Sequence, residues 1–220
     1  MDRAGPRSKR RARKPLDETG LRDLALSYVA RFATSGAKLE AYLARKIRER
    51  GVQSDEEREG DAEGNAGRIE SDGAESGTLN VRALVEQFID LGYVDDAAYA
   101  KSKARDLMAR GYGSRRVDQA LYAAGIDQEL RENETPSEAA ALRAAILQAR
   151  KRRFGPFDRS EEPQRLDPKR REKQVAAMLR AGHDFAVVRR IIDAENEEDL
   201  EQWLAEAEAE ERSDGDHSEW

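Results

Sequence analysis

The 220-residue sequence contains few of the side chains that enzymes use for acid–base, nucleophilic or metal-assisted chemistry. It has no cysteine, which excludes disulfides, thiolate zinc sites, iron–sulfur clusters and cysteine nucleophiles. Its two histidines are His183, which directly follows Gly182, and His217, which stands in a polar tail. A lone histidine without catalytic partners is more typical of a turn than of an active site. We therefore predict a protein that is not an enzyme and that needs no cofactor and no metal ion.

Basic side chains are the stronger candidates for function. Two of them, Arg115 and Arg116, fall in the first turn of a predicted helix, where the helix dipole disfavours positive charge. Each basic residue alone could belong to a solvated helix face, but as a set they favour a stripe that binds an acidic protein surface or a nucleic-acid backbone. The predicted partner-binding residues are Lys101, Lys103, Arg105, Arg110, Arg115, Arg116, Arg152, Arg153, Arg180, Arg189 and Arg190.

The net charge of −6 hides a strong segregation of charge along the chain. Residues 1–15 carry seven basic groups and one acidic group, whereas residues 52–77 carry two basic and nine acidic groups. Residues 194–220 carry one basic and twelve acidic groups, so the remaining part of the chain is mildly basic. An acidic protein can therefore still present a basic face to an anionic partner. No run of apolar residues is long enough for a membrane span or a signal peptide, which predicts a cytoplasmic protein without membrane contact.

The elements expected to position these residues are about nine or ten helices. No proline occurs between Leu16 and Thr135, and sustained alternation of β-branched residues is absent. Thr135-Pro136-Ser137-Glu138 predicts a helix that begins after a Thr135 cap and runs to about Arg153, and Asp167-Pro168 predicts another that ends near Gly182. Asp95 or Asp96 is expected to cap a helix from Ala97 rather than to bind a metal. Glycines that mark predicted helix ends are Gly51, Gly92, Gly111 and Gly125.

Comparing the sequence with itself reveals three similar segments. Helix starts at Ser35, Gly113 and Asp184 align, and they are followed at the same offsets by apolar pairs: Leu39 and Leu43, Val117 and Leu121, Val188 and Ile192. Six residues before each start stand Val29, Leu107 and Met178, and one turn earlier Leu26, Ala104 and Val175. Units this small gain stability mainly by stacking on their neighbours. The predicted fold is all-α, an elongated tandem array of three helix-turn-helix-like repeats of three helices each.

The predicted organisation has five parts. A basic disordered tail covers residues 1–15, and the first repeat covers 16–91 with a flexible acidic insertion at 52–77. The second repeat covers 92–134, the third covers 135–210 with a C-terminal helix anchored by Trp203, and an acidic tail covers 211–220.

The middle repeat carries a signature of turn and cap residues in a fixed order. It has a glycine-aromatic turn, paired aspartates, an aromatic-Ala step, an Arg-Gly-Tyr-Gly turn and a closing Gly-Ile, and the first and third repeats carry weaker versions of the turn. The residues of this signature are Gly92, Tyr93, Asp95, Asp96, Tyr99, Gly111, Tyr112, Gly113, Leu121, Gly125 and Ile126. In these residues and their spacing the sequence resembles the RecX family of recombination regulators. From the residues alone, these glycines indicate turns, and Tyr99 and Tyr112 are expected to pack between helices.

The resemblance implies a function in homologous recombination and the SOS response. RecX-like proteins bind the RecA recombinase and its filament on single-stranded DNA, and they inhibit its recombinase, ATPase and co-protease activities. A monomer that acts on RecA without chemistry of its own is therefore expected. The alternative that the residues leave open is a helical module that binds DNA or RNA directly, because basic residues follow the helix-turn-helix turns.

Overall fold

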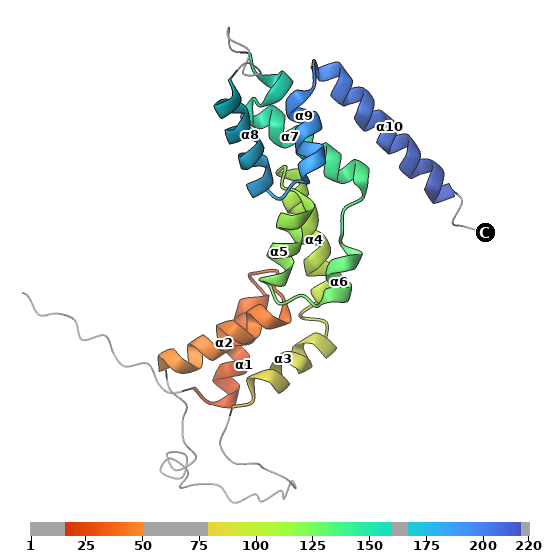
Figure 1. Ribbon diagram of the computed structural model, residues 1–220. Coiled ribbons are helices and arrows are strands. Elements are labelled where there is room, and N and C mark those ends of the chain that lie inside the picture. Colours follow the sequence, from red (N-terminus) through yellow and green to blue (C-terminus); the bar gives the residue numbers. More distant parts are fainter. Residues whose placement is uncertain (1–15, 51–78, 160–166, 217–220) are drawn as a thin grey trace, which may run out of the picture. The chain divides into compact units, whose positions relative to one another are not determined.

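The computed structural model describes residues 16–50, 79–159 and 167–216, and in these ranges it is helical with no strand. The chain divides into two compact units, residues 1–95 and 96–220. In the described part they contain ten α-helices and one short 3-10 helix (Figure 1), so the all-α prediction is confirmed. Their bounds are α1 (Glu18–Val29), α2 (Gly36–Arg50), α3 (Val81–Asp90), α4 (Asp96–Ala109), α5 (Ser114–Tyr122), α6 (Gln128–Asn133), α7 (Glu138–Arg152), η2 (Gly155–Phe157), α8 (Pro168–Arg180), α9 (Phe185–Asp193) and α10 (Glu197–Asp216).

The first unit contains helices α1, α2 and α3. Asp17 and Asn80 cap α1 and α3, because their side chains accept hydrogen bonds from the amides of Gly20 and Ala83. The core of the unit gathers the fully buried Leu21, Leu39, Leu43 and Phe88. The predicted acidic insertion at 52–77 lies outside the described part of the chain, and the described core residues come from the segments on either side of it.

The second unit begins with α4, α5 and α6. Its first core cluster holds Leu107, Val117, Leu121 and Ile126, with Tyr99 and Tyr112 packed against it, as the sequence predicts for the two tyrosines. The position of Gly113 as the N-cap of α5 and the burial of both Val117 and Leu121 also agree with the predicted repeat.

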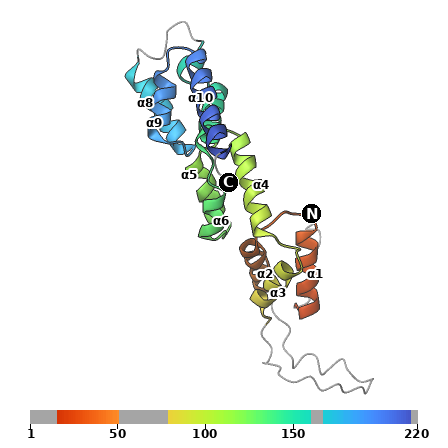
Figure 2. The ribbon, with the colours of Figure 1, turned by 90° about the vertical axis from the view of Figure 1, so that its right-hand side faces the viewer.

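Helices α7 to α10 share a second core cluster in the same unit. Met178 from α8, Val188 and Ile191 from α9, and Leu200 from α10 are all at most 2% exposed. Asp184 caps α9 by accepting a hydrogen bond of 2.7 Å from the Ala186 amide, and Asp167 caps α8 as predicted. Both ribbon views place α8 beside α9 (Figures 1 and 2), while α10 packs mainly on α7. This part of the unit therefore contains four α-helices, of which α10 is the predicted C-terminal helix.

Three details differ from the sequence predictions. The cap of α7 is Ser137, whose hydroxyl accepts a hydrogen bond from the Ala140 amide, and not Thr135. Helix α10 continues to Asp216, past the start of the predicted tail at residue 211. In α1 the buried residues are Leu21 and Ala25, whereas the predicted core residue Leu26 is 37% exposed. The connection between α1 and α2, residues 30–35, is also longer than the corresponding connections 110–113 and 181–184.

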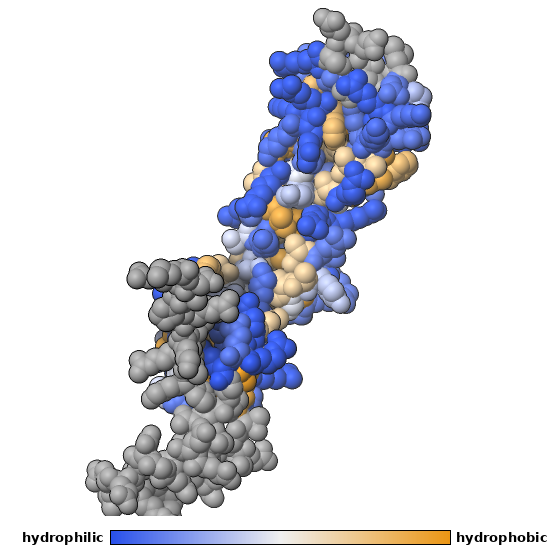
Figure 3. Space-filling model, turned by 90° about the vertical axis from the view of Figure 1, so that its left-hand side faces the viewer, coloured by the Kyte–Doolittle hydropathy of each residue, from blue (hydrophilic) through white to orange (hydrophobic). Residues whose placement is uncertain are grey.

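Hydrophilic residues cover most of the coloured surface in Figure 3, with hydrophobic residues exposed between them. Along the described ranges, no helix combines the length and the apolar character needed to cross a membrane. The predicted disordered tail at 1–15 and the predicted insertion at 52–77 both lie outside the described residues.

Candidate partner-binding site

Two glycine turns meet inside the second unit, and they position the start of α5. The Gly113 amide donates to the Ala181 carbonyl at 2.9 Å, and the Arg115 amide donates to the Gly182 carbonyl at 3.2 Å. A Cβ on Gly113 would lie 2.4 Å from the carbonyl carbon of Gly182, and one on Gly182 would lie 2.4 Å from the Arg116 nitrogen. Only glycine allows backbones to approach this closely. The turn of the second repeat is thereby joined to the turn of the third.

The two glycines of the Arg-Gly-Tyr-Gly turn have different reasons to be glycine. Gly111 has a φ of +89°, which the sequence prediction of a positive φ anticipates. Gly113 has a φ of −84°, which any residue can adopt, so its requirement is space and not conformation. The need for space at Gly113 arises from Gly182, about seventy positions away, so it cannot be predicted from the local sequence.

His183 lies at the same junction. It is 3% exposed, and its Nε2 is 3.0 Å from the carbonyl oxygen of Gly111. Burial lowers the pKa of His183 below its ordinary value, and the hydrogen bond to Gly111 opposes this shift only in part. The neutral imidazole therefore donates Nε2–H to the turn, a structural role that agrees with the sequence interpretation of a turn residue.

Several predicted binding residues contact other groups of the fold. Arg110 pairs with Asp106 at 3.0 Å, and Arg115 lies 3.6 Å from Asp184. The side chain of Arg189 lies 3.9 Å from Asp193, which Arg171 also holds through two hydrogen bonds that lower the pKa of its carboxyl. Arg190 stacks over the ring of Trp203 with its guanidinium carbon 3.9 Å from the ring centroid. These contacts are exposed, so each ion pair contributes only about 0–1 kcal/mol and leaves the cation accessible.

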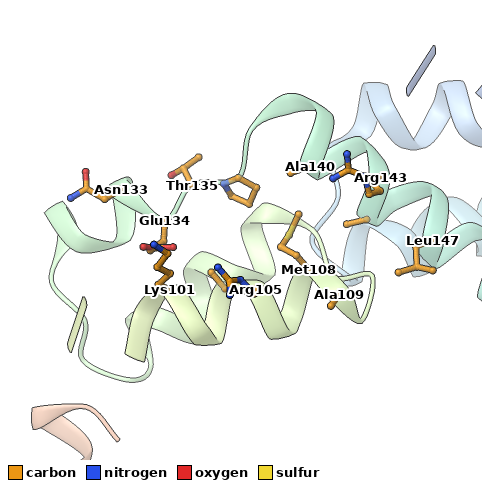
Figure 4. Close-up of a pocket in the computed structure, with 13 residues that line it drawn as sticks. Lys101, Arg105, Met108, Ala109, Asn133, Glu134, Thr135, Ala140, Arg143 and Leu147 are labelled. Atoms are coloured by element: carbon orange, nitrogen blue, oxygen red, sulfur yellow. The ribbon is translucent and has the colours of Figure 1, made fainter. Parts of the chain in front are cut away.

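The other predicted residues form no ion pair with any residue in the described ranges. These are Lys101, Lys103, Arg105, Arg116, Arg152, Arg153 and Arg180. Lys101 and Arg105 stand one turn apart on α4, and both line a pocket shown in Figure 4. The other predicted residues do not all line this pocket, since Arg115 lines a second one and Arg189 and Arg190 line a third.

Sequence reasoning left out two basic residues of α7 that contact the acidic helix α10. Arg143 hydrogen-bonds Glu208, and Arg150 lies 3.5 Å from Glu197 and 3.1 Å from Glu201. The signal for this contact was present in the acidic charge of residues 194–220. Only the packing of α10 on α7 shows which basic residues form ion pairs with the acidic side chains of α10.

The signature residues mainly shape the repeat. Gly92, Gly111 and Gly125 have positive φ angles where helices end, and Leu121 and Ile126 are buried. Asp95 stands immediately before α4, which starts at Asp96 and not at Ala97. Tyr93 is 53% exposed. Within the described ranges no group of three or more histidine, aspartate or glutamate side chains could hold a metal ion.

Comparison with known proteins gives the family of the chain. Residues 95–133 match the family model described as RecX, second three-helix domain. The chain is 30% identical over 196 residues to Regulatory protein RecX of Myxococcus xanthus, covering 88% of this chain and 94% of the relative. It is 34% identical over 126 residues to Regulatory protein RecX of Agrobacterium fabrum, covering 56% of this chain and 66% of the relative.

Solved structures agree in fold. The crystal structure of RecX from Lactobacillus salivarius superimposes with a TM-score of 0.54 at 17% identity, covering 80% of this chain and 94% of that one. A second crystal structure, of a regulatory protein RecX, superimposes with a TM-score of 0.52 at 16% identity, covering 80% of this chain and 71% of that one. At this identity the likeness concerns the helical fold alone. Together with the sequence match over nearly the whole length of the Myxococcus relative, these findings show that the chain belongs to the RecX family of regulatory proteins.

Proposed function

We propose that this protein binds the RecA recombinase, above all as a filament on single-stranded DNA, and inhibits its recombinase, ATPase and co-protease activities. The observation that supports the proposal most is the 30% identity to a RecX regulatory protein over 88% of the chain. In this proposal the protein acts as a monomer, performs no chemistry itself, and works by binding.

The helical repeats suit a repetitive partner. Each repeat exposes its own cations, such as Arg115 and Arg116 on α5 and Arg180 and Arg189 in the last part of the chain. When several modest contacts belong to one chain, binding of the first raises the effective concentration of the next. Exposed charges mainly accelerate association and select the partner, while apolar contacts supply most of the affinity.

The test is a titration of RecA's DNA-dependent ATP hydrolysis with increasing amounts of the protein. The proposal requires inhibition that saturates, and the absence of any inhibition would contradict it. In the variant carrying Arg115→Glu and Arg116→Glu, about tenfold more protein should be needed for half-inhibition, because two exposed cations become repulsive.

Two controls make this comparison specific. The variant with Lys169→Glu and Arg170→Glu changes the charge equally at exposed positions of α8 outside the predicted set, and it should inhibit like the original protein. Because Arg115 lies near Asp184, the milder pair Arg115→Gln and Arg116→Gln separates loss of binding from repulsion within the fold. Unchanged inhibition by both folded Arg115/Arg116 variants would remove these residues from the binding surface.

Direct binding to DNA is the second candidate function. Exposed Arg115 and Arg116 begin α5, the second helix of a helix-turn-helix pair, which is where such proteins present cations to nucleic acid. Contact with phosphates predicts that the protein binds a bare oligonucleotide and that its affinity falls steeply as salt rises. Tight, salt-sensitive binding to bare DNA together with no effect on RecA would favour this function over the first.

A further inference from the structure

A pocket of about 450 Å³ opens between α4, the connection 133–136 and α7 (Figure 4). All the elements that line it belong to the second unit. Its apolar lining comes mainly from Ala104, Met108, Pro136, Ala140, Ala144 and Leu147. The volume lies within the range of roughly 300 to 1,000 Å³ typical of ligand pockets. The pocket is therefore large enough for one bulky apolar side chain of a partner.

Three cations stand around this apolar lining. Lys101 and Arg105 come from α4 and Arg143 comes from α7, whereas Glu134 is the one acidic residue among the described residues of the lining. Lys101 and Arg105 are four residues apart, so their charges repel one another and weaken the helix that carries them. Neither forms an ion pair with a residue in the described ranges, which leaves both charges available to an external carboxylate.

The fold itself already brings a carboxylate to this rim. Arg143 hydrogen-bonds Glu208 of α10, a helix that is acidic on its exposed side and packs on α7 through apolar residues such as Leu200. Helix α10 is thus an acidic segment with apolar anchors that already packs on α7, next to the pocket. A partner segment of the same kind would suit the pocket.

We propose that the pocket is a docking site for a short acidic segment of a partner protein. One bulky apolar side chain of the segment occupies the space beside Met108 and Leu147, and carboxylates on either side of it pair with Lys101 and Arg105. The inference goes beyond the proposed function and does not depend on RecA being the partner. A nucleic-acid ligand fits less well, because none of the described residues that line the pocket has an aromatic side chain to stack on a base.

The methionines offer a direct readout of binding. The sequence has three, of which Met108 lines the pocket and Met178 is fully buried in the other core cluster of the unit. With the methyl groups labelled with carbon-13, the full chain is titrated with an acetylated peptide in which one phenylalanine stands between runs of glutamate. The Met108 resonance, assigned with Met108→Leu, should shift saturably while the Met178 resonance stays in place.

Matched peptides and variants test whether binding needs the apolar side chain, the carboxylates and the two cations. Replacing the phenylalanine by alanine, or the glutamates by lysines, should abolish the shift. The variant with Lys101→Glu and Arg105→Glu should bind at least about tenfold more weakly, and Lys169→Glu with Arg170→Glu should bind normally. An unchanged Met178 resonance reports that each variant is folded. If the variant with Lys101→Glu and Arg105→Glu does not fold, the variant with Lys101→Gln and Arg105→Gln takes its place. Absence of a saturable Met108 shift at millimolar peptide, equal binding of the alanine peptide, or a stronger response to oligothymidine would overturn the proposal.

Discussion

Among single residues, His183 and Gly113 hold the junction of the two turns together. Their roles cannot be recognised from the residues next to them in the sequence. His183 donates to the Gly111 carbonyl from a buried position, and Gly113 is required by the closeness of Gly182. The residues proposed for binding are different in kind. Lys101, Arg105 and Arg116 are exposed and form no ion pair with a residue in the described ranges, so their substitution should affect binding to partners more than folding.

Protonation of His183 should destabilise the second unit. Burial lowers the pKa of His183 in the folded protein, so between that pKa and the unfolded value of about 6.5 the unfolded chain binds more protons. The free energy of unfolding should therefore fall as the pH drops below about 6.5, and the loss is complete once the pH is below the folded pKa. The measurement is urea denaturation from about pH 7.5 to 5, the range in which histidine titrates.

A background with His217→Asn removes the other histidine from this measurement. In that background His183→Gln keeps a side-chain donor but does not titrate, so stability should depend less on pH than with His183 present. An identical pH dependence in the two proteins would show that His183 does not titrate differently on unfolding.

At the scale of elements, the approach of α5 to the turn after α8 sets the geometry of the second unit. The amides of Gly113 and Arg115 donate to carbonyls of that turn, and Asp184 both caps α9 and lies near Arg115. Lys151 of α7 donates to the Arg110 carbonyl at 3.2 Å and so supports the C-terminal end of α4. Backbone contacts, and not the exposed ion pairs, therefore define how α4, α5, α8 and α9 meet.

Gly182→Ala should cost more stability than Gly92→Ala, although both glycines have positive φ. A Cβ on Gly92 meets nothing within 4 Å, so that variant carries only the backbone strain of about 1–2 kcal/mol. A Cβ on Gly182 also lies 2.4 Å from the Arg116 nitrogen, which adds an overpacking cost of about 1–3 kcal/mol. Chemical denaturation of the two variants measures the difference, and equal losses would mean that the backbones move apart easily.

At the scale of the whole molecule, the chain consists of two units with separate cores. The core of residues 1–95 draws on α1, α2 and α3, whereas α4 to α10 supply the two clusters of residues 96–220. The chain is acidic in total, yet its most acidic described element, α10, packs mainly on α7 and contacts the basic Arg143 and Arg150 there. The net charge of the chain therefore does not predict the charge of the surface that an anionic partner would contact.

Replacing residues 53–77 by a short Gly-Ser linker should preserve the fold of the first unit. Leu21, Leu39, Leu43 and Phe88, which fill the core of that unit, all lie outside the segment, and the segment itself is rich in glycine and acidic residues. Because loop-closure entropy changes slowly with length, the free energy of unfolding should change by less than about 1 kcal/mol. Thermal melting followed by circular dichroism checks this, and loss of cooperative melting would refute it. Phe88→Ala, with a side chain that is 0% exposed, should cost about 3–5 kcal/mol in the same assay and serves as its positive control.

The local features of this protein follow from the sequence by itself. The apolar spacing of Val117 and Leu121 identifies helix α5 and its buried face, and Asp167-Pro168 marks the start of α8, because capping and periodicity act over a few residues. The predicted cap of α7 was wrong, since Ser137 and not Thr135 is its N-cap.

Tertiary structure alone decided what residues far apart in the chain do together. It placed Gly113 against Gly182, His183 on the Gly111 carbonyl, and Glu208 on Arg143. It also collected Lys101 and Arg105 with residues of α7 around one pocket, while other predicted cations took part in separate contacts. The physical reason is that side-chain type and spacing determine local backbone preference, whereas close approach, burial and charge pairing depend on which distant surfaces the packing brings into contact.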